Sequence, residues 1–257
     1  MSISLPRVTA VRDLLVLDGG GPLVIACDSV GGIGPKPADT FRADPWTTAH
    51  FATRVPLLEV LCTGAQPVVV VNTLSVARAG IGEEMIAAVR QLATRVGVTP
   101  DGVTGSTEDN VATNATGIGV TVVAALPAGA GPLGGGSRAG DVVLCAGLPR
   151  SAPEFTLYSG HPDLVDLAEV RAAVASGLVH DALPVGSKGL SWEGPQLAAS
   201  AGLTIRWRAA RPVDLGASGG PSSCVLLACA APDEAALRAL FAPSLPVHAV
   251  ADLEAPA

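Results

Sequence analysis

The sequence brings an acid, three glycines and a lysine together directly after an apolar run near the N-terminus. Residues 23–26 (LVIA) form the run, Asp28 is the acid, and Gly31, Gly32, Gly34 and Lys36 follow it. Glycines let backbone N–H groups approach a phosphate closely, and a lysine adds a positive charge. Neither a Walker loop nor the GxGxxG of dinucleotide-binding loops is present here. The segment is therefore either a phosphate-binding loop of another type or a surface turn with solvated charges.

A second candidate site is the polar segment 105–110 (GSTEDN). Glu108 and Asp109 offer carboxylates and Asn110 an amide oxygen, directly after Gly105, Ser106 and Thr107. Mg²⁺ prefers carboxylates, water and phosphate oxygens as ligands. The segment therefore suits a hard cation or, as the alternative, a polar loop that caps a strand.

The chain has only two lysines, Lys36 and Lys188, and both lie in glycine-rich loops, whereas its other cations are arginines. His180 and Asp181 stand shortly before Lys188 and suggest an acid–base pair, although a histidine that ends a helix is equally often a cap. Glu59 falls on a stretch that otherwise faces the core, so its carboxylate is either exposed or at the edge of a cleft.

The elements that position these residues follow from the spacing of the apolar side chains. Helices are predicted over residues 47–62, 82–96, 164–176, 196–201 and 232–240. Strands are predicted at residues 14–17, 23–26, 67–72, 117–126, 141–147 and 224–230, and the second of these is expected to end before Asp28. The glycine- and proline-rich residues 127–140 indicate a boundary between domains 1–130 and 131–257.

Composition narrows the class of protein. The 257 residues, of which 49% are hydrophobic and 15% charged, suit one large or two modest globular domains. A formal net charge of −7 without a basic stripe argues against a nucleic-acid partner. No apolar run approaches the roughly 20 residues of a membrane helix, and the N-terminus lacks a signal-peptide pattern. The five cysteines lack CxxC spacing, so we expect reduced, buried thiols in a cytoplasmic protein.

In their order along the chain, these motifs resemble the superfamily of aminoimidazole ribonucleotide (AIR) synthetase, thiamine-monophosphate kinase, selenophosphate synthetase and the hydrogenase-maturation carbamoyl dehydratase. The loop at residues 28–36 is similar to the DGVGTK loop of these proteins, with additional residues. Residues 57–67 (LLEVLCTGAQP) resemble their NDIxxxGAxP segment, with Glu59 in place of the aspartate, and Asn72 stands where a relative has an acid. The segments at residues 23–37, 52–74, 105–110, 116–122 and 179–190 most resemble the α-ribazole kinase branch.

The resemblance implies an α+β, two-lobed AIR-synthetase-like fold, with an N-terminal β-sheet lobe and a reduced C-terminal α/β lobe. It also implies a homodimer formed through the N-terminal sheets, with ATP and Mg²⁺ in a cleft between the lobes. The expected reaction is transfer of the γ-phosphoryl group to a nucleoside-like alcohol, α-ribazole, in cobalamin lower-ligand assembly. The alternatives are another ATP-dependent enzyme of the superfamily, either a ring-closing synthetase or a thiamine-phosphate kinase-like enzyme, or a non-catalytic nucleotide-binding protein.

The same resemblance implies roles for individual residues. It implies a small-molecule substrate and neither a membrane nor a nucleic acid as a partner. The metal ligands are expected to be Asp28, Glu59, Glu108, Asp109 and Asn110. The nucleotide is expected to contact Asp28, Gly31, Gly32, Gly34, Lys36, Asn72, Gly105, Ser106 and Thr107. The residues expected to take part in the transfer are Lys36, Lys188, His180 and Asp181, none of which is an obvious general base.

Overall fold

The computed structural model describes residues 7–11, 14–18, 21–127, 129–156 and 158–256 of the chain. These residues form two compact units, one of Met1–Val60 with Ala65–Gly131 and the other of Leu61–Gly64 with Pro132–Ala257. Each unit combines helices with a mainly antiparallel sheet, so the chain has an α+β fold.

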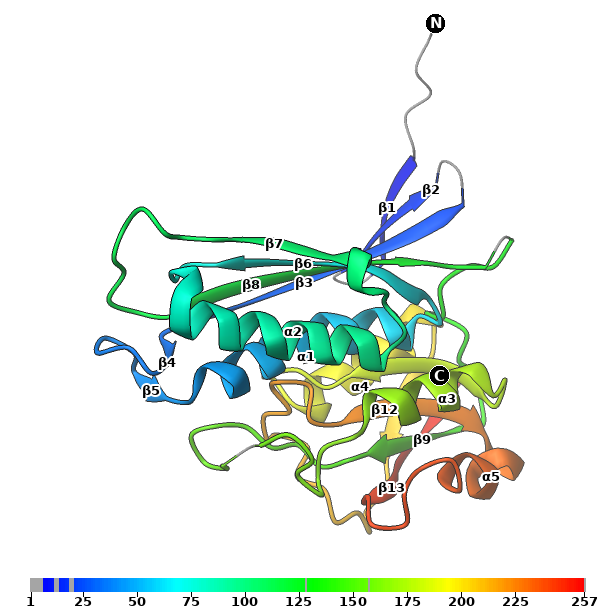
Figure 1. Cartoon of the computed structure of the whole chain (residues 1–257). Coiled ribbons are helices and arrows are strands. Elements are labelled where there is room, and N and C mark those ends of the chain that lie inside the picture. The colour runs from blue at the N-terminus through cyan, green and yellow to red at the C-terminus, as the bar shows by residue number, and fades with distance from the viewer. Residues whose placement is uncertain (1–6, 12–13, 19–20, 128, 157, 257) are drawn as a thin grey trace, which may run out of the picture. The chain divides into compact units, whose positions relative to one another are not determined.

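The first unit contains a six-stranded sheet in the order β1-β2-β3-β8-β6-β7 (Figure 1). Neighbouring strands are antiparallel except β6 and β7, which are parallel. As a result β3, β6 and β7 run in the same direction, and their C-terminal ends lie on the same side of the sheet. The strands are β1 (Arg7–Val11), β2 (Leu14–Asp18), β3 (Pro22–Gly31), β6 (Gln66–Leu74), β7 (Val103–Thr107) and β8 (Gly117–Ala125).

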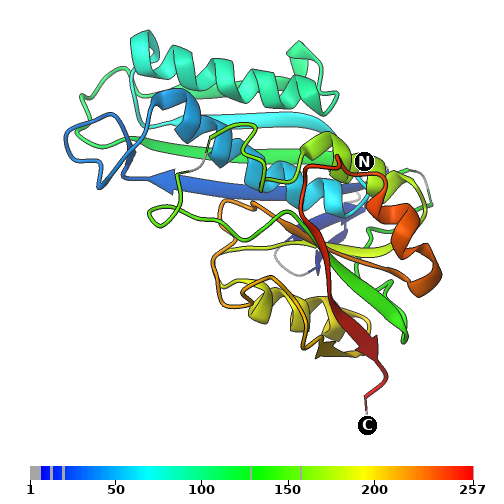
Figure 2. The same ribbon diagram turned by 90° about the horizontal axis from the view of Figure 1, so that it is seen from below.

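Helices α1 (Pro45–Cys62) and α2 (Glu83–Arg95) lie along one face of this sheet (Figures 1 and 2). Helix α2 is amphipathic, and Met85, Val89 and Leu92 are buried at helical spacing. Its acids stand in the first turn and Arg95 in the last, which suits the helix dipole. The remaining short elements of the unit are β4 (Ile33–Gly34), β5 (Phe41–Arg42), η1 (Arg78–Gly82) and η2 (Pro100–Gly102).

Strand β3 is longer than the apolar run that predicts it. It pairs with β8 without interruption from Leu23 opposite Ala125 to Gly31 opposite Gly117. The expectation that this strand ends before Asp28 is therefore wrong. Its long partner satisfies the backbone groups of the polar residues as well, so pairing continues past the last apolar side chain.

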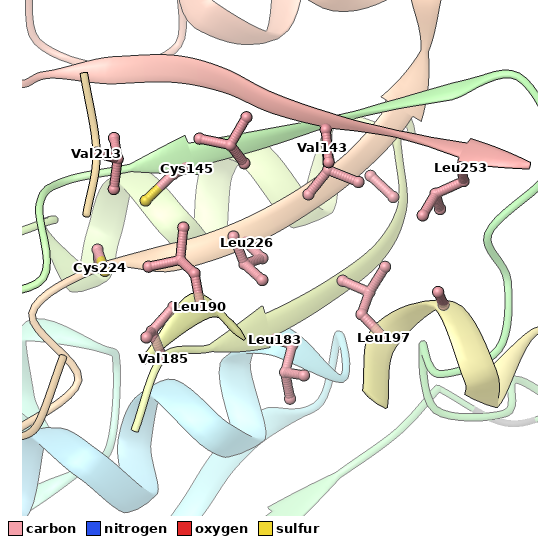
Figure 3. Packing of buried hydrophobic residues seen from close by; sticks show 14 residues of the cluster. Val143, Cys145, Leu183, Val185, Leu190, Leu197, Val213, Cys224, Leu226 and Leu253 are labelled. Carbon is pink, nitrogen blue, oxygen red and sulfur yellow. The ribbon is translucent and has the colours of Figure 1, made fainter. Parts of the chain in front are cut away.

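The second unit contains a five-stranded antiparallel sheet in the order β10-β12-β9-β13-β11. The central strands β9 and β12 are buried nearly throughout, and helix α4 adds Leu190 and Leu197 to the same core (Figure 3). The elements are β9 (Asp141–Ala146), α3 (Leu167–Ala175), β10 (Val179–Pro184), α4 (Leu190–Ser200), β11 (Thr204–Trp207), β12 (Val225–Ala230), η3 (Ala231–Asp233), α5 (Glu234–Arg238) and β13 (Val247–Glu254).

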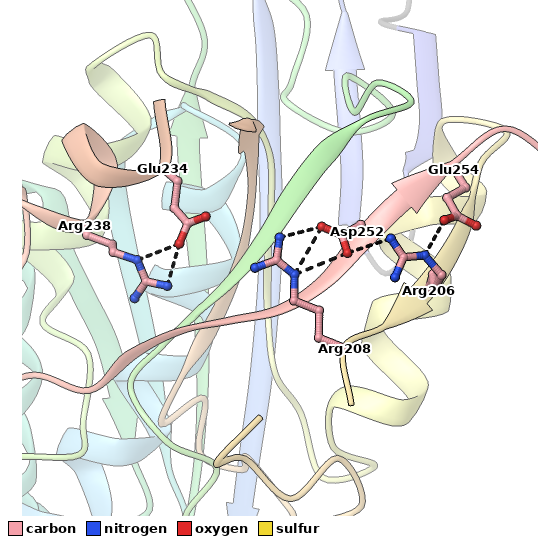
Figure 4. Close-up of polar contacts among 6 residues, drawn as sticks. All are labelled: Arg206, Arg208, Glu234, Arg238, Asp252 and Glu254. Atoms are coloured by element: carbon pink, nitrogen blue, oxygen red, sulfur yellow. Dashed lines mark hydrogen bonds and ion pairs between the residues drawn. The ribbon is translucent and has the colours of Figure 1, made fainter. Parts of the chain in front are cut away.

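Charged pairs join the edge strand β11 and the residue after it to β13 (Figure 4). Arg206 pairs with Glu254 and with Asp252, and Arg208 also pairs with Asp252 at 2.5 Å. Hydrogen bonds from Arg208, which outweigh the effect of burial, hold the pKa of Asp252 below its ordinary value. Such surface pairs contribute at most about 1 kcal/mol each, so they fix the register of the edge more than they stabilise the fold.

All five cysteines are unpaired, and four of them are buried as expected: Cys62, Cys145, Cys224 and Cys229. The expectation is wrong for Cys27, which is exposed. Cys27 follows the buried Ala26 on β3 and therefore points to the opposite face of the sheet, away from the helices. Within the part of the chain that the structure describes, no helix is both long enough and apolar enough to cross a bilayer.

Candidate active site

Three of the residues singled out in the sequence lie in one row across the sheet of the first unit. Asp28 on β3 and Asn72 on β6 both stand opposite Val120 of β8, and Asn72 in turn stands opposite Gly105 of β7. Paired residues of neighbouring strands point to the same face, and this is the face that buries Val120 and Asn72. With strands about 4.8 Å apart, the backbones of Asp28 and Asn72 are roughly 10 Å apart.

Asn72 explains why β7 has a glycine at its centre. Its side chain is only 4% exposed, and Nδ2 donates a hydrogen bond of 3.0 Å to the Thr104 carbonyl oxygen. A Cβ atom on Gly105 would lie 2.0 Å from the Asn72 carbonyl oxygen and 2.8 Å from Oδ1. Only glycine fits there, so the close approach of β6 and β7 accounts for Gly105 in the GSTEDN segment.

A cavity of about 230 Å³ lies between helix α2 and the edge strand β7, within the first unit. Four residues expected to contact the nucleotide line it, namely Asn72, Gly105, Ser106 and Thr107. The remaining lining residues are not marked by any motif of the sequence: Arg78, Ile86, Arg90, Val103 and Thr104.

The acidic residues of the GSTEDN segment, Glu108 and Asp109, directly follow β7. They lie on the side of the sheet where β3 and β6 also end. Asp109 accepts hydrogen bonds from the Thr107 hydroxyl at 2.5 Å and from the Arg78 backbone N–H at 2.9 Å. These two bonds, in that order, lower the pKa of the fully exposed Asp109 carboxyl, which therefore stays ionised at neutral pH. Oε1 of Glu108 accepts from the N–H groups of Asn110 and Val111, and Asn110 itself is exposed.

The loop after β3 is held against the loop before β8 by a buried acid that the site predictions omit. Asp39 is only 7% exposed. Its Oδ1 accepts from the Thr116 N–H at 2.7 Å, while Oδ2 accepts from the Thr116 hydroxyl and from the Lys36 N–H, also at 2.7 Å. Burial opposes ionisation of Asp39, but the hydrogen bonds from Thr116 and Lys36 outweigh it and lower the pKa.

Lys36 makes a second link between these loops. Its Nζ donates to the Thr113 carbonyl oxygen at 2.8 Å and to the Thr113 hydroxyl at 2.5 Å. Gly34 allows the loops to meet, because a Cβ atom there would lie 2.4 Å from Oγ1 of Thr116. The Gly32 N–H donates to the Thr116 carbonyl oxygen, whereas a Cβ on Gly31 would meet open space. The expected phosphate-binding loop is therefore held in place by hydrogen bonds to the loop before β8.

The acids of the first unit are suited to a divalent ion only together with other oxygen ligands. Within the described ranges, no three His, Cys, Asp or Glu side chains come together in a way that could hold a metal ion. Asp28 is half-buried, and burial raises its pKa despite a hydrogen bond from the Ser29 backbone; Glu59 is half-buried on α1. Mg²⁺ commonly takes one or two carboxylates and completes its shell with water and phosphate. Asp28 supplies one carboxylate on β3, and Glu108 and Asp109 supply two directly after β7.

His180 and Asp181 do not form the expected pair. His180 lies on strand β10 rather than at a helix end, and its Nδ1 is 2.8 Å from Oδ2 of Asp141. Asp181 is fully buried and accepts from the N–H groups of Gly135 and Ala182 at 3.0 and 2.8 Å. Each residue therefore has a different partner within the second unit, because both belong to a strand that separates their side chains.

Lys188 lies in the loop between β10 and α4. Its Nζ stands 3.9 Å from the centre of the Trp192 ring, whose residue is 48% exposed. The contact is a cation–π interaction within the second unit, at a site where both groups are open to solvent.

No family model matches the chain, and no curated protein matches it in sequence. Solved structures do match. Hydrogenase maturation protein HypE gives a TM-score of 0.68 at 16% identity, over 93% of this chain and 82% of HypE. Thiamine monophosphate kinase from Aquifex aeolicus gives 0.65 at 15% identity, over 95% of this chain and 89% of the kinase. PurL from T. maritima, complexed with AMPPCP, gives 0.62 at 15% identity, over 97% of this chain but 42% of PurL.

The chain has the fold of these proteins. The α+β, AIR-synthetase-like fold expected from the sequence is thereby confirmed. The Aquifex kinase has also been solved with AMPPCP and TMP, and HypE with ATP.

Proposed function

We propose that the protein is an ATP- and Mg²⁺-dependent phosphotransferase that acts on a small-molecule alcohol. One observation carries the proposal: four sequence-predicted nucleotide contacts, Asn72, Gly105, Ser106 and Thr107, line a single cavity. The acids that follow them, Glu108 and Asp109, lie at the edge where β3 also ends. Nucleotide complexes of proteins with the same fold support this assignment.

The residues of the first unit would divide the work between positioning and charge. Mg²⁺, when bound, would neutralise phosphate charge between carboxylates, with Asp28, Glu108 and Asp109 as the residues to hold it. Asp39 and Lys36 hold the loop after β3 in one conformation, so that Asp28 and the glycines have a fixed place. In the transfer, the acceptor oxygen bonds to the γ-phosphorus and the bond to the β–γ bridging oxygen breaks. ADP leaves with that electron pair, and the hydroxyl proton passes to solvent or a base.

Lys188 and Trp192 form an exposed pair on the second unit, where a cation and an indole ring can contact a phosphate or a heteroaromatic ring. His180 and Asp181 are held by Asp141 and by Gly135, which suits a supporting role for both better than proton transfer.

We propose α-ribazole as the acceptor, on the resemblance of the segments at residues 23–37 and 179–190 to the α-ribazole kinase branch. Thiamine monophosphate is the second candidate, because thiamine-monophosphate kinases from Aquifex aeolicus and Stenotrophomonas maltophilia share the fold. A non-catalytic nucleotide-binding protein is the third.

The proposed homodimer has a matching surface on the first unit. The sheet face opposite α1 and α2 carries partly exposed side chains in two rows across three strands. The first row is Ile25, Val123 and Val69, and the second is Cys27, Thr121 and Val71. Pairing of two such faces would remove apolar surface from water.

The deciding experiment is incubation of the protein with Mg·ATP and α-ribazole, with ADP and phosphorylated α-ribazole measured by mass spectrometry. We expect both products in equal amounts, and thiamine monophosphate in a parallel reaction separates the second candidate. Binding of ATP without turnover of either acceptor would favour the non-catalytic alternative, and no ATP binding at all would overturn the proposal.

A further inference from the structure

The cavity between α2 and β7 carries two positive charges without a negative charge among its lining residues. Arg78 of η1 and Arg90 of α2 both line it, and none of its lining residues is an acid. Among the described residues neither guanidinium group makes a hydrogen bond, although Arg78 interacts electrostatically with the carboxylate of Asp109, which lies outside the lining. On a chain with a formal net charge of −7, this cavity is a local site for an anion.

The fold holds both arginines at the cavity. The backbone N–H of Arg78 donates to Oδ1 of Asp109 at 2.9 Å, which ties η1 to the loop after β7. The turn that follows Arg78 is tight, since a Cβ atom on Gly82 would lie 2.5 Å from the Ala77 carbonyl oxygen. Arg90 stands one helical turn after Ile86, so both project from the same side of α2.

The size and chemistry of the cavity indicate which part of a nucleotide it takes. Its volume of about 230 Å³ is smaller than the roughly 300–1,000 Å³ of sites that enclose a whole ligand. Guanidinium groups bind phosphate through paired hydrogen bonds, and the hydroxyl of Ser106 adds a donor, whereas that of Thr107 donates to Asp109. A neutral base in the same place would leave the guanidinium group of Arg90 without a counter-charge.

We propose that Arg78 and Arg90 form an anchor for the phosphate groups of the ligand, and that this anchor acts without a divalent ion. The proposal rests on the proposed function for the identity of the ligand as a nucleoside triphosphate. The anchor places the polyphosphate beside Thr107, and Asp109, besides its proposed part in holding Mg²⁺, positions Arg78 by accepting a hydrogen bond from its backbone N–H.

The test is calorimetric titration of sodium tripolyphosphate, and separately of adenosine, into the full chain in the presence of EDTA. We expect tripolyphosphate to bind and Arg78→Gln and Arg90→Gln each to weaken binding about tenfold or more, as for loss of one charge-assisted contact. The matched control is Arg95→Gln, which removes the same charge from an exposed position on the same helix outside the cavity lining. We expect this control to bind like the parent.

Three results would overturn the anchor: no tripolyphosphate binding, an equal loss in all three variants, or adenosine binding that depends on Arg78 and Arg90. The lining arginines are exposed, so thermal unfolding is expected to show that each variant folds. The two proposals fail separately. Tripolyphosphate binding that needs both arginines, without any ATP turnover, would retain the anchor and reject the phosphotransferase.

Discussion

Asp28 and Asn72 stand opposite the same residue, Val120, from the two strands that flank β8. They are 44 positions apart in sequence, yet the sheet places them in one row on one face. Asn72 is buried and hydrogen-bonded, whereas burial of Asp28 raises the pKa of its carboxyl against the effect of the Ser29 N–H. Carboxylates whose ionisation is disfavoured by burial are frequent at functional sites, which is why Asp28 is a candidate for one.

Asp28→Asn is therefore expected to stabilise the ligand-free protein at neutral pH while it weakens Mg·ATP binding. A carboxyl whose folded pKa is raised favours the folded state below its unfolded pKa of 3.8, and this contribution is lost as pH rises through the folded pKa. The variant should have the higher melting temperature at pH 7, and its advantage should disappear near pH 3. A variant that is less stable at pH 7 would show that Asp28 is a structural residue.

Asp39 is expected to behave in the opposite way, because its folded pKa is lowered. Its stabilisation is present above the unfolded pKa of 3.8 and is lost as pH falls through the folded value. Asp39→Asn should cost about 2 kcal/mol of unfolding free energy at pH 7, on the scale of hydrogen bonds to a charged group. Chemical denaturation at pH 7 and pH 3 measures this, and a cost that does not shrink at pH 3 would contradict the ionised state of Asp39.

Two variants distinguish a structural role of Lys36 from a catalytic one. Its Nζ is bound to Thr113, so Lys36→Met removes both the link and the charge. Thr113→Val keeps the charge of Lys36 and removes the hydroxyl, which accepts from Lys36 and donates to the Ser75 carbonyl oxygen. If the charge acts on phosphate, Lys36→Met should lower kcat about 100-fold or more, the scale of a lost transition-state donor, and Thr113→Val much less. Steady-state kinetics with Mg·ATP measure both variants. Equal losses in the two variants would show that Lys36 acts only by holding the loop.

The sheet face away from the helices is expected to form the dimer. Val123→Arg places a charge in the middle of the row Ile25–Val123–Val69 and should convert a dimer into a monomer without unfolding. Leu240→Arg, at another partly exposed apolar position, is the control and should leave the dimer intact. Light scattering coupled to gel filtration gives the masses. A parent that is already monomeric, or a Val123→Arg dimer, would reject this interface.

The sequence predicts those elements whose pattern is set by local periodicity. Helix α2 and strands β6, β8, β9 and β12 lie within a few residues of their predicted bounds, because each has a continuous apolar run or face. Helix α4 begins earlier than predicted, since Gly194 and Pro195 indicate a break in the sequence. The structure explains Gly194: a Cβ atom there would lie 2.5 Å from Cη2 of Trp207.

Strands that depend on their neighbours could not be predicted. β11 has only four residues and exists through its regular pairing with β13. β13 itself has a bulge between Ala249 and Ala251, where it pairs with β9, and this breaks the alternation of its side chains. β10 contains the polar residues His180 and Asp181, which interrupt the apolar pattern typical of a buried strand. Their partners, Asp141 and Gly135, come from other parts of the chain, so the sequence alone does not indicate that they are paired. Tertiary pairing satisfies these groups, and periodicity contains no information about it.

The candidate site shows the same division. Asn72 and residues 105–107 could be identified from motif order and do line the cavity. Arg78, Arg90 and Asp39 could not, because no motif marks them. Arg78 and Asp39 also depend on contacts with residues 31 and 77 positions away. For Arg90 the sequence contains one local indication. It stands one turn after Ile86 on a helix that is predicted to be amphipathic.

A crystal structure of the full chain with Mg²⁺ and AMPPCP tests the central claim most directly. The account predicts the phosphate chain in the cavity between α2 and β7, within contact of Thr107, Arg78 and Arg90, and the metal ion beside Asp28 or the Glu108–Asp109 loop. Electron density for the nucleotide in the second unit alone, or a phosphate chain outside this cavity, would contradict it.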